Sequence, residues 1–206
     1  MHSKLNTYLN KINIKDISEE RRLVLTPLRN FVKDKVSKGD PVKLTFICTH
    51  NSRRSHFGQV WAKIAAEYFG VKRVYTFSGG TEATACNPRT IKALERAGCM
   101  IGVEGKKGNP VYSISYAADE PALVAFSKLF SDIENPQENF AAIMTCDSAN
   151  EQCPVISGAD VRLPILYIDP KVSDDTPSEV NTYNERCRQI AIEMFWVFRD
   201  LTAIAS

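Results

Sequence analysis

The stretch VKLTFICTHNSRRSHFGQVWAKIAAEYFG, residues 42–70, combines three local patterns that together predict one folding unit. Residues 42–48 form a short apolar run, which is typical of a buried strand. Residues 55–70 carry apolar side chains at helical spacing and finish at Gly70, a residue that commonly ends helices. Because only the polar residues 49–54 lie between them, we expect a strand, a tight loop and a helix.

The rest of the chain continues to alternate between helix-like and strand-like segments. The other predicted elements, in chain order, are a helix over residues 18–39, a strand over 73–80, a helix over 87–98, strands over 123–127, 140–145 and 162–168, and a long helix over 176–205. Such alternation is typical of α/β folds. We therefore predict a three-layer α/β fold with a mostly parallel, twisted sheet, helices on both faces and an anion-binding loop after the first strand. Residues 1–40 would form a helical N-terminal extension, and residues 41–206 the main domain.

Composition and charge narrow the class of protein. The 206 residues are 44% hydrophobic and 24% charged, with a net charge of +2, and basic residues are interspersed among acidic ones. This pattern favours neither a nucleic-acid partner nor a membrane surface. Residues 1–20 lack the apolar core of a signal peptide, so we expect a cytoplasmic protein. The six cysteines include no CxxC pair and the three histidines lack metal-site spacing, so we expect neither a metal nor a cofactor.

Cys48 and Arg54 stand at the two ends of the predicted loop. In a strand–loop–helix unit, backbone N–H groups and the positive end of the helix favour an anion at the loop centre. A guanidinium adds a fork of donors suited to a tetrahedral oxyanion, and the same field favours a thiolate. A thiolate beside an oxyanion is a nucleophile facing its substrate. The simpler interpretation, a buried strand-end cysteine and a surface arginine, is weaker because a strand precedes the pair and Ser55 with a helix follows it.

Three segments resemble the low-molecular-weight protein tyrosine phosphatase family. CTHNSRRS, residues 48–55, resembles that family's anion-binding loop, and TFSGGTEATACNPRTIKALERAG, residues 76–98, is similar to the strand–turn–helix segment after it. The pair Asp169-Pro170 resembles the general-acid loop. The likeness covers roughly residues 42–100 and 140–200, so it implies that the main domain is a phosphatase-like catalytic domain.

The resemblance implies a role for each matching residue. Cys48 would be the nucleophile, Arg54 the oxyanion clamp and Asp169 the general acid that protonates the leaving oxygen. Ser55 would stabilise the thiolate of Cys48, and Asn51 would hold the loop in shape. The remaining residues of the predicted oxyanion loop are Thr49, His50, Ser52 and Arg53. His50 stands where the family usually has a glycine, and its ring would narrow or recharge the mouth of the pocket.

A fourth segment, MTCDSANEQCP at residues 144–154, resembles the redox segment of the thioredoxin-coupled arsenate reductases. The resemblance implies an enzyme of arsenic detoxification that reduces arsenate to arsenite, with a thioredoxin-like protein as the reductant. Cys146 would attack Cys48, and Cys153 would then attack Cys146 to leave a redox-active disulfide. Because seven residues on a helix make about two turns, this segment would have to unwind when oxidised.

Two other functions remain open at this level. A phosphatase would hydrolyse phosphotyrosine or small phosphate monoesters through a Cys48 phosphocysteine, with Cys146 and Cys153 passive. A non-enzymatic oxyanion or redox sensor would signal through residues 1–40, although Asp169 is needed only for leaving-group chemistry.

Several other features have simpler interpretations. Gln59 replaces the glutamate of a cation site that arsenate reductases usually have, so we expect a weak cation effect or none. Cys86, Cys99 and Cys187 are assigned to packing. Residues 105–139 would form a lid, a dimer contact or additional core.

Overall fold

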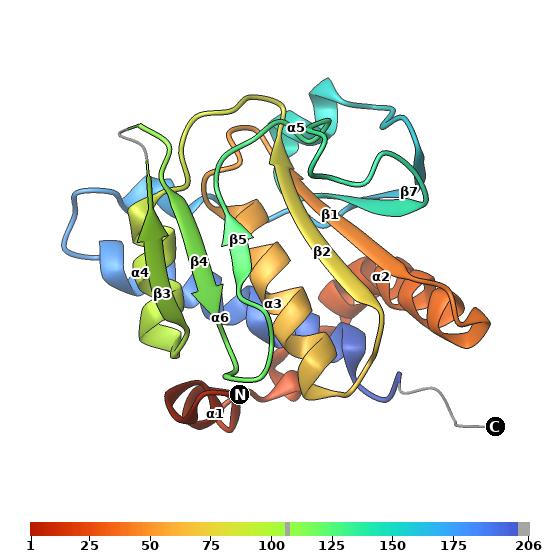
Figure 1. Ribbon diagram of the computed structural model, residues 1–206, viewed down its shortest axis with the longest axis horizontal. Coiled ribbons are helices and arrows are strands. Elements are labelled where there is room, and N and C mark those ends of the chain that lie inside the picture. The colour runs from red at the N-terminus through yellow and green to blue at the C-terminus, as the bar shows by residue number, and fades with distance from the viewer. Residues whose placement is uncertain (106–107, 202–206) are drawn as a thin grey trace.

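The computed structural model describes residues 1–105 and 108–201 as an α/β fold (Figure 1). Its elements, in chain order, are α1 (Ser3–Leu9), η1 (Ile14–Asp16), α2 (Glu19–Lys38), β1 (Val42–Cys48), α3 (Arg54–Tyr68), β2 (Val74–Gly80), α4 (Pro88–Ala97), β3 (Met100–Glu104), β4 (Val111–Ser115), β5 (Leu123–Ala125), β6 (Phe140–Met144), α5 (Asp147–Gln152), β7 (Ala159–Pro164), η2 (Pro170–Ser173) and α6 (Glu179–Phe198). None of the helices in these two ranges is long and apolar enough to cross a membrane.

The main sheet has four parallel strands in the order β2-β1-β6-β7. Its central strand β1 pairs from Val42 to Cys48 with β2, from Val74 to Gly80. In a parallel sheet all carboxyl ends meet at one edge, which is where ligands of α/β folds bind. The predicted α/β class with a parallel sheet is confirmed.

The two faces of this sheet are covered differently. On one face, Leu44 and Phe46 of β1 join a large apolar core with side chains from α2, α3 and α6, including Leu28, Trp61 and Phe198. On the other face, a smaller cluster lies beneath α5 and the segment before β6. Its buried members are Ile47, Cys48, Phe140, Ala142, Met144, Cys146, Ala149 and Ile156, and Phe130 packs against them. The predicted catalytic cysteine therefore lies in the smaller core.

A second sheet, antiparallel and in the order β3-β4-β5, lies beside the main one (Figure 1). Of its three strands, only β5 was predicted. Four of the five residues of β3 are exposed and the fifth is half-buried, so the sequence there lacks the apolar alternation from which strands are read. The second sheet also accounts for part of the segment 105–139, for which a lid was one expectation.

The later elements differ in their bounds from the prediction. β7 ends at Pro164, and residues 165–168, expected as strand, instead run on as an irregular segment. That segment still bonds to the end of β6, because the Ile165 N–H donates to the Met144 carbonyl and the Tyr167 N–H to that of Thr145. The helix predicted over 176–205 is α6, which begins at Glu179 and ends at Phe198, and residues 202–206 lie outside the described part of the chain.

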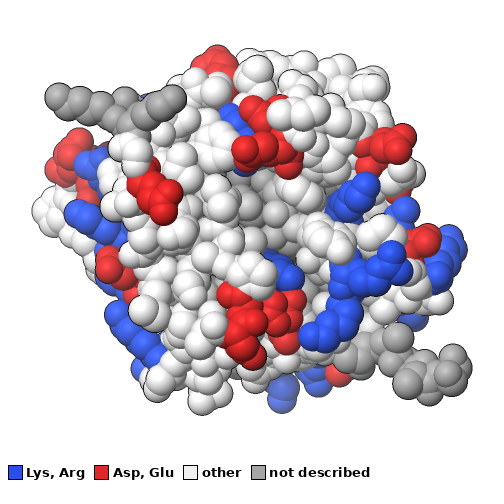
Figure 2. Space-filling view, in the orientation of Figure 1, with Lys and Arg blue, Asp and Glu red and all other residues white. Residues whose placement is uncertain are grey.

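The N-terminal helices pack directly on the main domain. Leu25 and Leu28 of α2 are fully buried, and α2 contacts α6, β1 and β7. α1 contacts α4, where Gly98 ends the helix at φ +112° and a Cβ on that residue would strike the backbone of Leu5. Charged side chains of both signs are interspersed over the face shown in Figure 2.

Candidate active site

The loop between β1 and α3 lies at the carboxyl edge of the main sheet, and its shape depends on Asn51. This residue is fully buried and has a φ of 43°, a left-handed conformation that asparagine tolerates better than most residues. Its Nδ2 donates to Ser55 Oγ at 2.9 Å, and its Oδ1 accepts from the Lys128 N–H at 2.9 Å. The side chain thus joins the first turn of α3 to the segment after β5.

Cys48 lies at the end of β1 with only 3% of its surface exposed. Its Sγ is 3.1 Å from Ser55 Oγ, which lies in the first turn of α3. Ser55 also accepts a hydrogen bond from Asn51, so its own proton is free to point at the sulfur. The structure therefore places a hydroxyl donor beside the candidate nucleophile.

Arg54 connects the loop to the Asp-Pro segment that follows β7. One of its terminal nitrogens donates to Asp169 Oδ2 at 2.7 Å and the other to the Tyr167 carbonyl at 3.0 Å. Its Nε is buried and has no hydrogen-bond partner among the described residues. A guanidinium with a spare buried donor is suited to an additional acceptor such as an oxyanion.

Arg53 bonds to residues outside the loop. Its Nε donates to the Tyr183 hydroxyl at 2.7 Å and one terminal nitrogen to Asp174 Oδ2 at 3.1 Å. Tyr183 in turn donates to Asp174 Oδ1 at 2.8 Å. These contacts join the loop to α6 and to the segment after η2. The sequence did not predict that Tyr183 and Asp174 are the partners of Arg53. Tyr183 lies on the apolar side of its helix, and Asp174 lies in a polar turn.

His56 also supports the loop, and sequence reasoning missed it. It is fully buried, with Nε2 2.8 Å from the Asn51 carbonyl and Nδ1 3.2 Å from Ser78 Oγ. Since a carbonyl only accepts, Nε2 carries the hydrogen and the ring is neutral with Nδ1 accepting. Burial, helped by the charge of Lys128, lowers the pKa of His56 to about 3. The sequence position of His56, two residues after Arg54, was the one feature that could have predicted its role in supporting the loop.

The mouth of the loop borders an open pocket of about 560 Å³. Its lining includes His50, Ser52, Arg53, Cys86, Asn87 and Lys171. The His50 Nδ1 is 3.1 Å from a carboxylate oxygen of Glu82, so this side chain lies at the rim. On the inner side, Gly80 of β2 comes so close that a Cβ there would be 2.6 Å from the Thr49 carbonyl and 2.7 Å from the Asn51 nitrogen.

Cys146 lies next to the loop. Its Sγ is 3.4 Å from Thr49 Oγ1, and only 2% of the residue is exposed. Cys146 immediately precedes α5 and Cys153 immediately follows it, and Cys153 is half-buried. The structure thus brings the first of the two additional thiols beside the oxyanion loop and leaves the second accessible at the far end of a six-residue helix.

All six cysteines lie in the described residues, and all are free thiols. Cys86, Cys99 and Cys187 are buried, and burial raises the pKa of each, to about 12 for Cys187. These three thiols therefore stay protonated at neutral pH, which fits a packing role. Within residues 1–105 and 108–201, no group of three or more His, Cys, Asp or Glu side chains is placed to hold a metal ion.

Known proteins resemble this chain at low identity. No protein-family model matches it. An arsenate reductase of Bacillus licheniformis is 27% identical over 146 residues, and one of Bacillus subtilis is 28% identical over 144 residues; each match covers 69% of this chain and 84% of the relative. These relatives confirm the predicted resemblance to arsenate reductases.

Similar solved structures carry both kinds of name. A low-molecular-weight protein tyrosine phosphatase from T. tengcongensis has a TM-score of 0.49 at 14% identity, covering 74% of this chain and 95% of that one. An arsenate reductase from Archaeoglobus fulgidus has a TM-score of 0.46 at 15% identity, covering 75% and 98%.

Proposed function

We propose that this protein is a thiol-dependent arsenate reductase in which Cys48, Cys146 and Cys153 relay electrons to arsenic. The observation that carries the proposal is the place of Cys146, whose Sγ lies 3.4 Å from Thr49 Oγ1 in the oxyanion loop. The similarity to two curated arsenate reductases supports it.

The first step would form a bond between sulfur and arsenic. Arsenate in the loop would accept hydrogen bonds from backbone N–H groups and from the spare Nε of Arg54. It would compete with Asp169 for the guanidinium, which frees the carboxyl to carry a proton. The Cys48 thiolate would attack arsenic, the bond from arsenic to one hydroxyl group of hydrogen arsenate would break, and that hydroxyl would leave as water after taking the proton from Asp169.

The second step would transfer the electrons. The Cys146 thiolate attacks the Cys48 sulfur, a disulfide forms between them, and the sulfur–arsenic bond breaks. The electron pair of that bond passes to arsenic, which leaves as arsenite. Two thiols are oxidised and one arsenic is reduced by two electrons, so the step balances.

The third step would move the disulfide to the surface. The Cys153 thiolate attacks Cys146, and Cys48 leaves as a thiolate ready for another arsenate. Seven residues of helix span about 10 Å, whereas the Cα atoms of a disulfide lie within about 7 Å. α5 therefore has to unwind, after which a thioredoxin-like dithiol protein would reduce the Cys146–Cys153 bond.

A phosphatase is the second candidate, favoured by one observation. Cys48, Ser55, Arg54 and Asp169 form a complete set for transfer of a phosphoryl group to sulfur, without any further thiol. Water would then hydrolyse the phosphocysteine.

Turnover of three variants separates the two candidates. Arsenite production is measured with thioredoxin, thioredoxin reductase and NADPH, and hydrolysis of p-nitrophenyl phosphate is measured in parallel. We expect Cys146→Ser and Cys153→Ser to abolish multiple turnover of arsenate while sparing ester hydrolysis. Cys99→Ser, at a buried cysteine outside the site, is the matched control and should retain both activities. Ester hydrolysis by all proteins with no arsenite from any would identify a phosphatase.

A further inference from the structure

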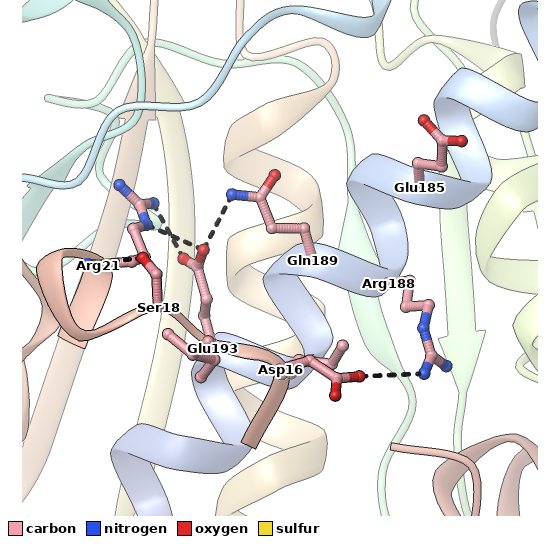
Figure 3. A pocket seen from close by; sticks show the side chains of 9 residues that line it. Asp16, Ser18, Arg21, Glu185, Arg188, Gln189 and Glu193 are labelled. Carbon is pink, nitrogen blue, oxygen red and sulfur yellow. Dashed lines mark hydrogen bonds and ion pairs between the residues drawn. The ribbon is translucent and has the colours of Figure 1, made fainter. Parts of the chain in front are cut away.

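The N-terminal helix α2 contributes a side chain to a buried polar cluster on α6. Glu193 is only 2% exposed, and its carboxylate accepts four hydrogen bonds. Arg21 supplies two of them, from Nε and a terminal nitrogen, each at 2.9 Å. The Gln189 side-chain nitrogen supplies one at 2.9 Å and the Tyr167 hydroxyl one at 2.7 Å. Figure 3 shows Arg21 and Gln189 converging on Glu193.

Tyr167 connects this cluster to the active site. Its ring is buried, and the Arg21 guanidinium lies 4.8 Å from the ring centroid. Its backbone carbonyl accepts from Arg54 at 3.0 Å, and its backbone N–H donates to the Thr145 carbonyl at 3.1 Å. Asp169 follows two residues later. The position of Tyr167 therefore determines where the segment with the candidate general acid leaves the sheet.

The protonation state of Tyr167 suits this arrangement. Burial and the neighbouring charge of Glu193 raise the pKa of Tyr167 well above its ordinary value. The hydroxyl therefore keeps its proton and can only donate to the Glu193 carboxylate. Arg21 forms the ion pair with this carboxylate, and a buried carboxylate without a paired cation is strongly disfavoured.

We infer that Arg21 is a positioning residue, which holds Asp169 at its working position through Glu193 and Tyr167. The inference rests on the proposed function, in which Asp169 is the general acid. It gives the N-terminal extension a role in the reaction although Arg21 lies outside the loop between β1 and α3. An open pocket of about 560 Å³ borders the Arg21–Glu193 pair, so shortening the arginine removes its hydrogen bonds without enclosing a new void.

A double-mutant cycle between Arg21→Met and Asp169→Asn tests the inference. Arg29→Met is the matched control, because Arg29 also joins α2 to α6, through the Trp196 and Val197 carbonyls, but contacts neither Glu193 nor Tyr167. The readouts are kcat/KM for arsenate and for p-nitrophenyl phosphate, together with the thermal midpoint of each variant. Tyr167→Phe, which removes one hydroxyl and keeps the ring, serves where Arg21→Met does not fold.

General acid catalysis contributes at least about a hundredfold, so its partial loss through Arg21→Met should lower kcat/KM about tenfold. In the Asp169→Asn background, Arg21→Met should lower kcat/KM by less than about twofold, because the carboxyl group that Arg21 positions is already absent. Arg21→Lys should restore part of the loss, and Arg29→Met should change the midpoint but not kcat/KM.

Three results would overturn the inference. An equal loss from Arg21→Met in both backgrounds would show that the residue acts on stability or on another group. No loss at all in the otherwise unchanged protein would show that α2 is not needed for positioning. If the unmodified protein hydrolyses the ester but makes no arsenite, the reductase proposal fails while the ester cycle still tests Arg21. If it does neither, Asp169 has no acid role and the inference falls with it.

Discussion

The loop between β1 and α3 and the helix α5 lie at the same edge of the sheet, but other segments hold them in very different ways. Three carbonyls of the loop bond to the segment between β2 and α4: that of Cys48 accepts from Thr81, that of Thr49 from Glu82, and that of Ser52 from Asn87. α5 buries one residue, Ala149, and Arg162 is the side chain that bonds to its C-terminal end, at Asn150 and at the Cys153 carbonyl. The proposed mechanism needs a fixed loop to bind the oxyanion and an α5 that can unwind, and the contacts of the two regions differ in that direction.

The largest effect is expected in the loop between β1 and α3, from Asn51→Ala. The change removes two buried hydrogen bonds and places alanine at a φ of 43°. These losses together should lower the free energy of unfolding by about 4 kcal/mol, measured by urea denaturation.

The folded Asn51→Ala protein should also be less active, beyond any loss of activity that comes from unfolded protein. Since Asn51 orients Ser55 toward Cys48, kcat/KM should drop by about a hundredfold or more. Asn51→Gly is the control, because glycine accepts the backbone conformation and so isolates the loss of the side chain. Equal stability of the alanine and asparagine proteins would mean that the loop does not depend on this residue.

The next effect is a pH dependence of stability that comes from His56. Its pKa is about 3 in the folded protein against 6.5 ordinarily, so below pH 6.5 the unfolded chain binds a proton that the folded one does not. Stability from this group is therefore complete above pH 6.5 and is lost as the pH falls toward 3. The loss should approach about 1.4 kcal/mol per pH unit.

Urea denaturation between pH 7 and pH 4.5 measures that slope. His56→Gln should remove it, even though the variant is less stable at every pH, whereas His50→Gln at the exposed rim should keep it. An unchanged slope in His56→Gln would place the titrating group elsewhere.

The smallest effect is expected at α5, from Arg162→Met. The change releases the C-terminal end of α5 and should lower the free energy of unfolding by no more than about 1 kcal/mol. The Cys146–Cys153 disulfide should form about two- to threefold faster, because α5 unwinds more easily. Stopped-flow arsenate reduction, with Arg188→Met as a surface control, measures the rate. A slower rate in Arg162→Met would contradict the view that α5 must open.

The comparison also explains which parts of the molecule could be predicted from sequence. β1, the loop and α3 are contiguous in the sequence. The apolar run that ends at Cys48 predicts the strand, and the helical spacing of apolar residues after Arg54 predicts the helix. The α/β class with a mostly parallel sheet follows from the alternation of strands with helices. β3 was missed because most of its side chains are exposed, so that its pairing with β4 leaves no pattern in the sequence.

The supporting residues of the site were not predictable for a different reason. Arg53 meets Tyr183, and Arg21 meets Glu193, across more than a hundred residues of chain. Such contacts depend on how α2 and α6 pack in the folded protein, which the spacing of neighbouring residues in the sequence does not predict. A single glutamate between Ile192 and Met194 on an otherwise apolar helix side was the only available sign that a buried partner existed.

Disulfide mapping after a single turnover tests the three-thiol relay most directly. Reduced protein is mixed with one equivalent of arsenate, quenched with acid, alkylated and digested for mass spectrometry. The account predicts a Cys146–Cys153 disulfide in the unmodified protein and a trapped Cys48–Cys146 disulfide in Cys153→Ser, each with one equivalent of arsenite. Arsenite without either disulfide, or a disulfide that includes Cys86, Cys99 or Cys187, would contradict it.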